Sequence, residues 1–395
     1  MYVERNILSL LKTSLEHFQA VLLTGPRQSG KTTFLRHQLG DIAEYVTFDD
    51  PMERMFAKED PNAFLDRFER KSVILDEIQY APHLFSYIKI RIDEDRFNGC
   101  EDRKWIMTGS QQFQLMRNIS DSLAGRVAVL ELLPFDFTER QIVSEEVPLS
   151  KQIWVGGYPE NVLHPAKRDL WVKSYIATYL ERDVRQLNNV IDLGKFHSFI
   201  ALCASIHGQE LNYTKLASRC GISVPTCKEW LSVLEASYII FLLQPFYENF
   251  GKRVIKSPKL YFLDSSLVAT LTRQPTPDAL ISGAMSGAFF EGFIISETYK
   301  TLSSRGSKPE LYFWRSHDGV EIDLLLIRED ELLPVEIKCT QTPSSKHAVG
   351  LEKFSSFVKD SKNISQKIIV CNVKKSSFIA KITKAVNWQE FLLEL

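Results

Sequence analysis

The sequence predicts an α/β protein of two or three domains, and three observations lead to this class. The chain has 395 residues, and one domain commonly takes roughly 100–200. Hydrophobic residues make up 44% and charged residues 25%, which excludes disordered, collagen-like and coiled-coil proteins as descriptions of the whole chain. In the first third, apolar runs at 20–24 and 71–76 suit buried strands, and a stretch that suits a helix separates them.

Charge and targeting signals narrow the class further. Lysine and arginine number 48 against 49 aspartates and glutamates, a formal net charge of −1, which excludes a wholly basic binder but leaves room for a local basic face. Residues 1–18 carry charges among their apolar positions and suit one face of a helix rather than a signal peptide. Because no apolar run reaches the ~18 residues of a membrane span, we expect a soluble, cytoplasmic protein with no membrane partner.

The cysteines point to the same compartment. They contain no CxxC pair and no spacing typical of a metal site. We therefore predict six buried, reduced thiols in a reducing environment. They are Cys100, Cys203, Cys220, Cys227, Cys339 and Cys371.

A glycine-rich segment follows the first apolar run. Residues 25–32 read GPRQSGKT and fit the pattern GxxxxGK[ST] between a strand and a helix. The two glycines let backbone N–H groups point at phosphate oxygens; Lys31 would reach the β- and γ-phosphates and Thr32 would bind Mg²⁺. A chance match is the alternative, and the strand–helix context argues against it. The predicted ATP-binding residues here are Gly25, Pro26, Arg27, Gln28, Ser29, Gly30, Lys31, Thr32 and Thr33.

A second strand, KSVILDEIQ at 71–79, ends in two acidic residues. In P-loop ATPases the first acid of such a Walker B strand holds the Mg²⁺ shell, and a following glutamate polarises the attacking water. We assign these roles to Asp76 and Glu77. An acidic pair at a solvated strand end is the ordinary alternative.

Two further positions are candidates for the same site. The strand in KWIMTGSQQF at 104–113 ends in polar residues, and Thr108 or Ser110 would be the sensor that such ATPases place between their two Walker strands. An ordinary strand-to-turn connection explains the same residues. Arg126 would sense or complete a neighbouring ATP site, or it is a surface arginine before a strand.

The motifs together resemble one known family. GPRQSGKTT, TFDDP at 47–51, ILDEIQYAP at 74–82, MTGSQQF, SLAGR at 122–126 and GGYPE at 156–160 occur in the order found in a family of bacterial and archaeal AAA-type ATPases. That family carries a C-terminal domain of unknown function distantly similar to PD-(D/E)XK nucleases. The resemblance covers nearly the whole chain and implies ATP binding in a DNA-associated homo-oligomer.

The middle of the chain predicts a winged helix. Residues 165–190 have helical periodicity, and residues 211–240 have the pattern of a helix-turn-helix. Gly221 lies in the expected turn, Ser223 is the expected N-cap and Pro225 an early helical residue. The apolar stretch 238–264 would form the hairpin of the wing.

This region is also locally basic. Eight basic residues lie between positions 195 and 260, against the acids Glu210, Glu229, Glu235 and Glu248. Basic residues suit phosphate contacts, which supply affinity without sequence information. DNA binding is thus expected, with protein packing as the alternative. The basic residues are Lys195, Lys215, Arg219, Lys228, Lys252, Arg253, Lys256 and Lys259.

The last third carries a set of acidic residues and one lysine that matches the nuclease-like motif. Glu291 lies in a predicted helix at 288–302, Asp323 in a hairpin at 311–327, and Glu336 and Lys338 in a strand at 331–340. Residues two apart in a strand share a face. Carboxylates would hold Mg²⁺, and the lysine would position water. ExK is common in solvated strands, so cleavage and DNA binding without cleavage both stay open.

The predicted fold class is therefore α/β: a P-loop AAA-type ATPase domain, then a winged-helix module and a C-terminal α/β PD-(D/E)XK nuclease-like domain. The predicted function is ATP-dependent DNA processing, with metal-dependent nuclease activity left open. A nucleotide-switch scaffold or signalling ATPase is the alternative, and a DNA clamp without cleavage is a third. The expected segments are 1–160 for the ATPase, 161–194 for a helical linker, 195–265 for the winged helix and 280–395 for the nuclease-like domain.

Overall fold

The computed structural model describes most of the chain as two compact units. The N-terminal unit comprises Met1–Phe135, Ala236–Tyr238 and Ser303–Ser307, and the C-terminal unit comprises Asp136–Glu235, Ile239–Leu302 and Lys308–Leu395. The residues described are 1–68, 71–100, 102–109, 122–144, 147–180, 192–246, 257–306, 309–328, 331–358, 363–364, 366–380 and 382–395.

A parallel sheet forms the centre of the N-terminal unit. Its strand order is β2-β3-β4-β1-β5, and every pair runs parallel. The strand β4 lies between β1 and β3, which confirms the predicted place of the strand that ends in Thr108. The strands are β1 (Ala20–Thr24), β2 (Ala43–Thr47), β3 (Ser72–Asp76), β4 (Trp105–Thr108) and β5 (Val127–Glu131).

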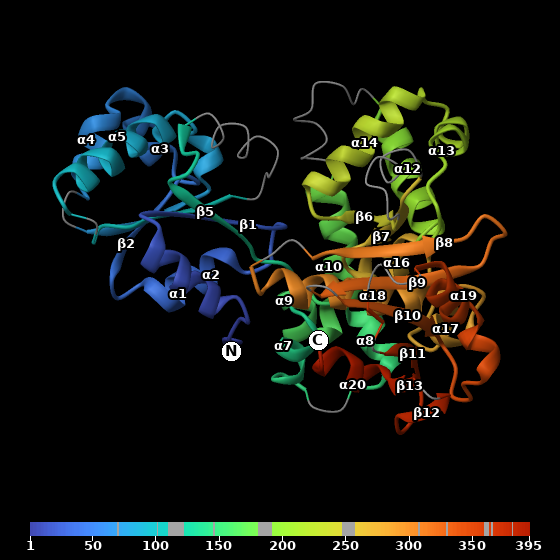
Figure 1. The fold of residues 1–395 in the computed structure, drawn as a ribbon. Coiled ribbons are helices and arrows are strands. Elements are labelled where there is room, and N and C mark those ends of the chain that lie inside the picture. The colour runs from blue at the N-terminus through green and yellow to red at the C-terminus, as the bar shows by residue number, and fades with distance from the viewer. Residues whose placement is uncertain are drawn as a thin grey trace. The chain divides into compact units, whose positions relative to one another are not determined.

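Helices cover both faces of this sheet (Figure 1). Along β1, Val21 and Leu23 pack with the helices α1 and α2, while Ala20 and Leu22 pack with α3, α4 and α5. This alternation follows from the two-residue period of a strand, and it explains why the strands read as unbroken apolar runs. The helices are α1 (Leu8–His17), α2 (Lys31–Leu39), α3 (Pro51–Glu59), α4 (Pro61–Asp66) and α5 (Leu84–Phe97), with a short 3₁₀ turn at Ile78–Tyr80.

The C-terminal unit begins with short helices. The segment predicted to be helical over 165–190 contains a 3₁₀ turn, the helix α10 and a π-helical turn at Ile176–Leu180. Residues 181–191 lie outside the described ranges. Leu170, one of the apolar residues that give this segment its helical periodicity, is exposed. The helices up to the hairpin are α7 (Phe137–Gln141), α8 (Leu149–Val155), α9 (Pro159–Leu163), α10 (Arg168–Tyr175), α12 (Leu193–Ser205), α13 (Tyr213–Cys220) and α14 (Val224–Ala236).

The predicted helix-turn-helix elements are present as α13 and α14. Gly221 ends α13 with a φ of 62°, and the Ser223 hydroxyl accepts a hydrogen bond from the Thr226 N–H at 3.1 Å. Pro225 is the second residue of α14, where its missing N–H removes no helical bond. The antiparallel hairpin of β6 (Ile240–Pro245) and β7 (Lys259–Phe262) follows. Three of the basic residues counted in the predicted winged helix lie outside the described residues: Lys252, Arg253 and Lys256.

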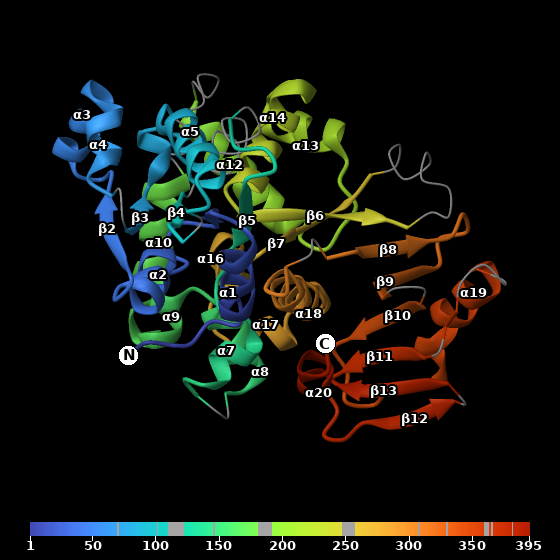
Figure 2. The ribbon, with the colours of Figure 1, turned by 60° about the vertical axis from the view of Figure 1, so that its left-hand side comes forward.

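The hairpin continues the C-terminal sheet. In the described residues this sheet has eight strands in the order β12-β13-β11-β10-β9-β8-β6-β7 (Figure 2). Strand β6 pairs in parallel with β8 through Gln244 and Tyr312, so the predicted wing and the predicted nuclease-like strands share one sheet. The further strands are β8 (Leu311–Arg315), β9 (Glu321–Arg328), β10 (Glu331–Lys338), β11 (Lys367–Cys371), β12 (Ser377–Ala380) and β13 (Thr383–Asn387).

Different helices pack on the two faces of this sheet. Leu324 and Val335 belong to the core that contains α18 and α20, whereas Leu325 and Leu332 belong to the core around α19. The predicted helix at 288–302 and the predicted strands at 311–327 and 331–340 are thus confirmed. The remaining helices are α16 (Ser265–Leu271), α17 (Ala279–Ser282), α18 (Ser286–Ser303), α19 (Val349–Val358) and α20 (Trp388–Leu393).

All six cysteines are free, but not all are buried. Cys100 is exposed because it lies in the turn after α5, and Cys339 is partly exposed just beyond the end of β10. The prediction of six buried thiols is therefore wrong at these two positions. Among the described residues, every helix is too short or too polar to cross a lipid bilayer.

Candidate nucleotide site and carboxylate cluster

The phosphate-binding loop has the backbone that its glycines predict. Gly25 has a φ of 141°, and a Cβ built there would lie 2.2 Å from the Leu132 carbonyl oxygen, so the position requires glycine. Gly30, with a φ of 92°, begins α2. The Lys31 ammonium donates to the carbonyls of Gly25 at 3.0 Å and Pro26 at 2.8 Å. The lysine therefore lies across the loop, where a phosphate chain would pass beneath the helix N-terminus.

The predicted magnesium ligands lie side by side at the ends of neighbouring elements. The Thr32 hydroxyl donates to the two carboxylate oxygens of Asp76 at 2.9 and 3.1 Å. A hydroxyl and a carboxylate are hard oxygen donors of the kind that Mg²⁺ prefers. The donor set therefore fits the ion that an AAA-type site would use.

Thr108 joins the two acids of the Walker B strand. Its buried hydroxyl donates to Asp76 and accepts a hydrogen bond from the Glu77 N–H at 3.1 Å. Glu77 has a left-handed backbone, with a φ of 57°, a conformation that is costly for a residue with a side chain and is common at functional sites. Of the two sensor candidates, the structure brings Thr108 to the site, and Ser110 lies outside the described residues.

Two residues of this site, Tyr45 and Arg5, were not predicted from the sequence. The Tyr45 hydroxyl donates to Asp76 Oδ2 at 2.7 Å, and burial, followed by the neighbouring Asp76, raises the pKa of Tyr45. The Arg5 guanidinium donates to the carbonyls of Ser29 at 2.9 Å and Leu133 at 2.6 Å. Tyr45 could have been suspected, because parallel strands end at the same edge of a sheet, but the sequence holds no signal for Arg5.

The remaining residues predicted to bind the nucleotide differ in their exposure to solvent. Arg126 donates to both oxygens of Asp93 at 2.7 and 3.1 Å, in a partly exposed ion pair. Gln28 and Thr33 are exposed and Arg27 is half-buried. The roles of these residues stay predictions.

The predicted nuclease-like residues form a cluster in the C-terminal unit. Lys338 lies between two acids, with Nζ 3.0 Å from Asp323 Oδ2 and 2.6 Å from Glu336 Oε1. The Ile337 N–H also donates to Asp323 Oδ2 at 2.8 Å. The predicted common face of Glu336 and Lys338 is confirmed.

Burial and mutual repulsion change how these acids titrate. Burial and the charge of Asp323 raise the pKa of Glu336 to about 8 and that of Glu291 to about 6. Among the described residues, Glu336 Oε2 has no hydrogen-bond partner. Burial favours neutral Lys338, but Asp323 and Glu336 outweigh it and raise the pKa of the ammonium.

Glu291 is held by residues of the preceding hairpin. Its Oε1 lies 3.0 Å from Lys259 Nζ and accepts a hydrogen bond from the Tyr261 hydroxyl. Lys259 was expected on a basic, DNA-facing surface, and that expectation is wrong. Its side chain is buried, and its ammonium pairs with Glu291 on α18 and with Glu321 on β9.

The cluster fits a metal ion less well than the nucleotide site does. Within the described ranges, no three histidine, cysteine or acidic side chains are arranged to hold an ion. Each predicted ligand, Glu291, Asp323 and Glu336, is instead paired with a lysine. An ion would have to compete with these ammonium groups.

The parallel sheet, the P-loop and the polar residues at its edge define a P-loop ATPase of the AAA type. The family described as AAA domain matches residues 17–141. Two families described as domains of unknown function match the rest, DUF8612 over 148–278 and DUF4143 over 286–391.

Relatives of unknown function span most of the chain. It is 31% identical over 350 residues to the uncharacterized proteins Rv2008c of Mycobacterium tuberculosis and Mb2031c of Mycobacterium bovis, covering 87% of this chain and 76% of each relative. The chain belongs to the family of these mycobacterial proteins. Among solved structures, the Walker-type ATPase paby2304 of Pyrococcus abyssi matches with 15% identity and a TM-score of 0.45, covering 69% of this chain and 96% of that one.

Proposed function

We propose that this protein binds and hydrolyses ATP with Mg²⁺ and uses the cycle to act on DNA. The observation that carries the first part is the convergence of Thr32, Asp76 and Thr108 beside the P-loop. Lys31 would bind the β- and γ-phosphates, and Thr32 and Asp76 would hold Mg²⁺, which supplies charge neutralisation on the phosphates. Glu77 would orient the attacking water, and Thr108 would fix both acids.

Single-site variants test hydrolysis. Lys31→Ala removes the phosphate-binding ammonium, and Glu77→Gln removes the carboxylate but keeps the shape. We expect Lys31→Ala to lose both ATP binding and turnover, and Glu77→Gln to keep binding while turnover falls at least tenfold. Lys12→Ala, on the exposed face of α1, is the matched control and should behave as wild type. Full turnover in Lys31→Ala would exclude this site.

Exposed basic residues support the DNA part of the proposal. Lys215 and Arg219 on α13 and Lys228 on α14 are exposed, and in a winged helix the second helix of the pair enters a DNA groove. Changing Lys215, Arg219 and Lys228 to glutamate should weaken DNA binding and flatten its dependence on salt by about one unit of log–log slope per lost phosphate contact. Unchanged binding would favour a protein-packing role.

The carboxylate cluster is proposed as a nuclease-like site whose activity an assay must decide. Mg²⁺- or Mn²⁺-dependent cleavage that disappears in Asp323→Ala and Lys338→Ala but persists in Lys31→Ala would establish a nuclease. Asp318→Ala removes an exposed carboxylate from the same hairpin and serves as control. If wild type cleaves nothing, a DNA clamp remains.

A nucleotide-switch scaffold is the second candidate function. The lysine pairs that occupy the acids of the cluster favour it. The two candidates differ in whether DNA changes ATP turnover. For either one we propose a homo-oligomer with ATP at the subunit boundary, which the molar mass in solution with and without ATP would test.

A further inference from the structure

A buried lysine from the middle of the chain lies inside the carboxylate cluster. Lys259 is 3% exposed. Its Nζ lies 3.0 Å from Glu291 Oε1, pairs with Glu321 on β9, and is 5.5 Å from the centre of the Phe313 ring. Four elements, β7, α18, β8 and β9, thus meet at one ammonium group.

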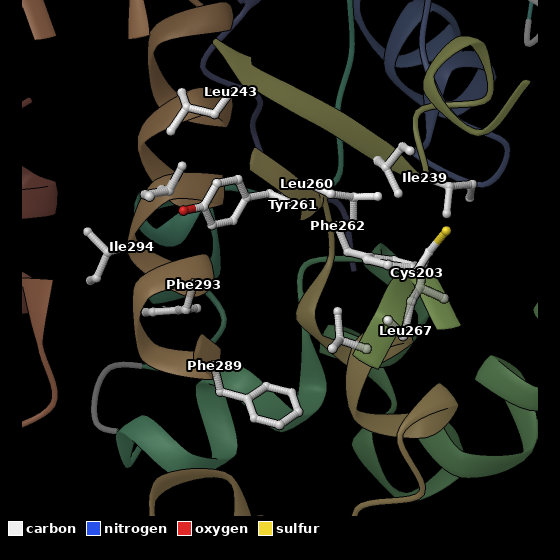
Figure 3. Packing of buried hydrophobic residues seen from close by; sticks show 14 of the residues in the cluster. Cys203, Ile239, Leu243, Leu260, Tyr261, Phe262, Leu267, Phe289, Phe293 and Ile294 are labelled. Atoms are coloured by element: carbon white, nitrogen blue, oxygen red, sulfur yellow. The ribbon is translucent and has the colours of Figure 1, made fainter. Parts of the chain in front are cut away.

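The neighbouring tyrosine belongs to the same arrangement. Figure 3 shows Tyr261 on β7 with its hydroxyl directed toward α18, and this hydroxyl donates to Glu291 Oε1. Glu291 therefore receives hydrogen bonds from two residues of one strand. Neither residue belongs to the acidic and lysine set that the nuclease-like motif predicts.

Electrostatics show why a cation is needed at this position. Glu291, Glu321 and Asp323 lie close enough to act on Lys259, and their attraction outweighs the burial that would otherwise favour its neutral form, so the pKa of Lys259 is raised. A buried ion pair is weak evidence for net stability, but removing one partner leaves an uncompensated charge. While they are ionised, these acids are stabilised by a positive charge among them, which an ammonium or a metal ion supplies.

We propose that Lys259 is the built-in cation of this cluster and takes the place of a divalent ion between Glu291 and Glu321. Lys338 has the corresponding position between Asp323 and Glu336, but its side chain is 38% exposed whereas that of Lys259 is 4% exposed. Metal exchange is thus confined to the Asp323–Glu336 side, and the cluster takes at most one divalent ion. The single exchangeable ion at the Asp323–Glu336 side rests on the proposed nuclease-like function. The role of Lys259 does not depend on it.

Lys259→Met tests the inference. The variant keeps most of the side-chain volume and leaves Glu291 and Glu321 without their ammonium. In nucleotide-free protein, we expect it to bind one Mn²⁺ ion per chain more than wild type, counted by electron paramagnetic resonance. Mn²⁺ should also raise its melting temperature by several degrees more than it raises that of wild type. The double variant Lys259→Met/Glu291→Gln should lose the extra ion.

Controls separate this role from simple packing. Lys353→Met removes a surface lysine paired with Asp318 and should bind Mn²⁺ as wild type does. A packing role alone predicts a lower melting temperature for Lys259→Met with no extra ion and no recovery in Mn²⁺, and that result would overturn the inference. If Lys259→Met does not fold, the variant Glu291→Gln provides the test. We expect Glu291→Gln to bind as many Mn²⁺ ions per chain as wild type. The loss of an ion in this variant would contradict the proposal.

A separate variant tests whether the proposed nuclease-like site holds an exchangeable ion. If Asp323→Asn binds as many ions as wild type, no exchangeable ion sits at the Asp323–Glu336 side. The extra ion of Lys259→Met, measured as a difference, would still support a built-in cation.

Discussion

At the scale of single residues, Asp76 has the most densely bonded carboxylate of the nucleotide site. Hydroxyl groups from Thr32, Tyr45 and Thr108 all donate to it. A hydrogen bond to a charged group contributes about 1.5–3 kcal/mol. These donors come from α2, β2 and β4, so the orientation of the carboxylate proposed to bind Mg²⁺ depends on three elements at once.

Tyr45→Phe tests this dependence. The variant removes one donor and keeps the ring, so Asp76 is less firmly oriented toward Thr32. We expect the Mg²⁺ concentration for half-maximal ATP turnover to rise several-fold, with ATP affinity in the absence of Mg²⁺ changed less than twofold. Tyr87→Phe, on α5 of the same unit, is the control. An unchanged Mg²⁺ requirement would show that Tyr45 does not position Asp76.

The buried carboxyl group of Glu336 should make the free energy of unfolding depend on pH. Burial and Asp323 raise its pKa from 4.5 to about 8, so the folded state binds a proton more tightly than the unfolded state does. This contribution is fully present below the unfolded pKa and is lost as the pH rises through about 8. Glu336→Gln resembles the protonated form and should gain stability relative to wild type between pH 5 and pH 9. Melting curves at both values, with Glu16→Gln on α1 as control, measure this, and a constant difference would contradict it.

At the scale of elements, cap and turn residues predict the helices α13 and α14 correctly, whereas strand pairings between distant segments are not predicted. Ser223, Pro225 and Gly221 are cap and turn residues whose effect is local, so the sequence predicts α13 and α14 correctly. The P-loop and its flanking strand and helix follow for the same reason. The pairing of β6 with β8 joins segments far apart in the chain. No local pattern encodes this pairing, and the sequence therefore does not predict that Lys259 is buried.

The GGYPE segment illustrates a contact that only the structure reveals. Gly156 has a φ of 72°, and a Cβ there would lie 2.2 Å from Asp264 Oδ1. The other oxygen of Asp264 accepts a hydrogen bond from the Gly157 N–H at 2.7 Å, and Oδ1 also caps α16 through the Ser266 N–H. One carboxylate thus joins the end of α8 to the start of α16.

Gly156→Ala should therefore destabilise the C-terminal unit. Backbone strain and displacement of Asp264 together predict a loss of roughly 2–4 kcal/mol in the free energy of unfolding. Gly221→Ala is the matched control, since its φ is 62° and no atom lies within 4 Å of the added Cβ; strain alone predicts about 1–2 kcal/mol. Chemical denaturation measures both, and equal losses would contradict the role given to Asp264.

At the scale of the whole molecule, the chain leaves the N-terminal unit and returns to it twice, at Ala236–Tyr238 and Ser303–Ser307. Tyr238 follows α14 by two residues, and its hydroxyl lies 2.8 Å from Thr24 Oγ1, at the end of the strand before the P-loop, and donates to Glu131 at 3.1 Å. The segment that follows α14 thus contributes Tyr238 to the N-terminal unit, where it hydrogen-bonds the end of β1.

The most direct test of this account is ATP turnover by wild type and Lys31→Ala, each with and without single-stranded, duplex and branched DNA. The account predicts that one form of DNA raises wild-type turnover several-fold and that Lys31→Ala stays inactive with every form. Wild-type turnover that ignores all three forms would contradict DNA-coupled hydrolysis and favour the nucleotide switch with protein partners.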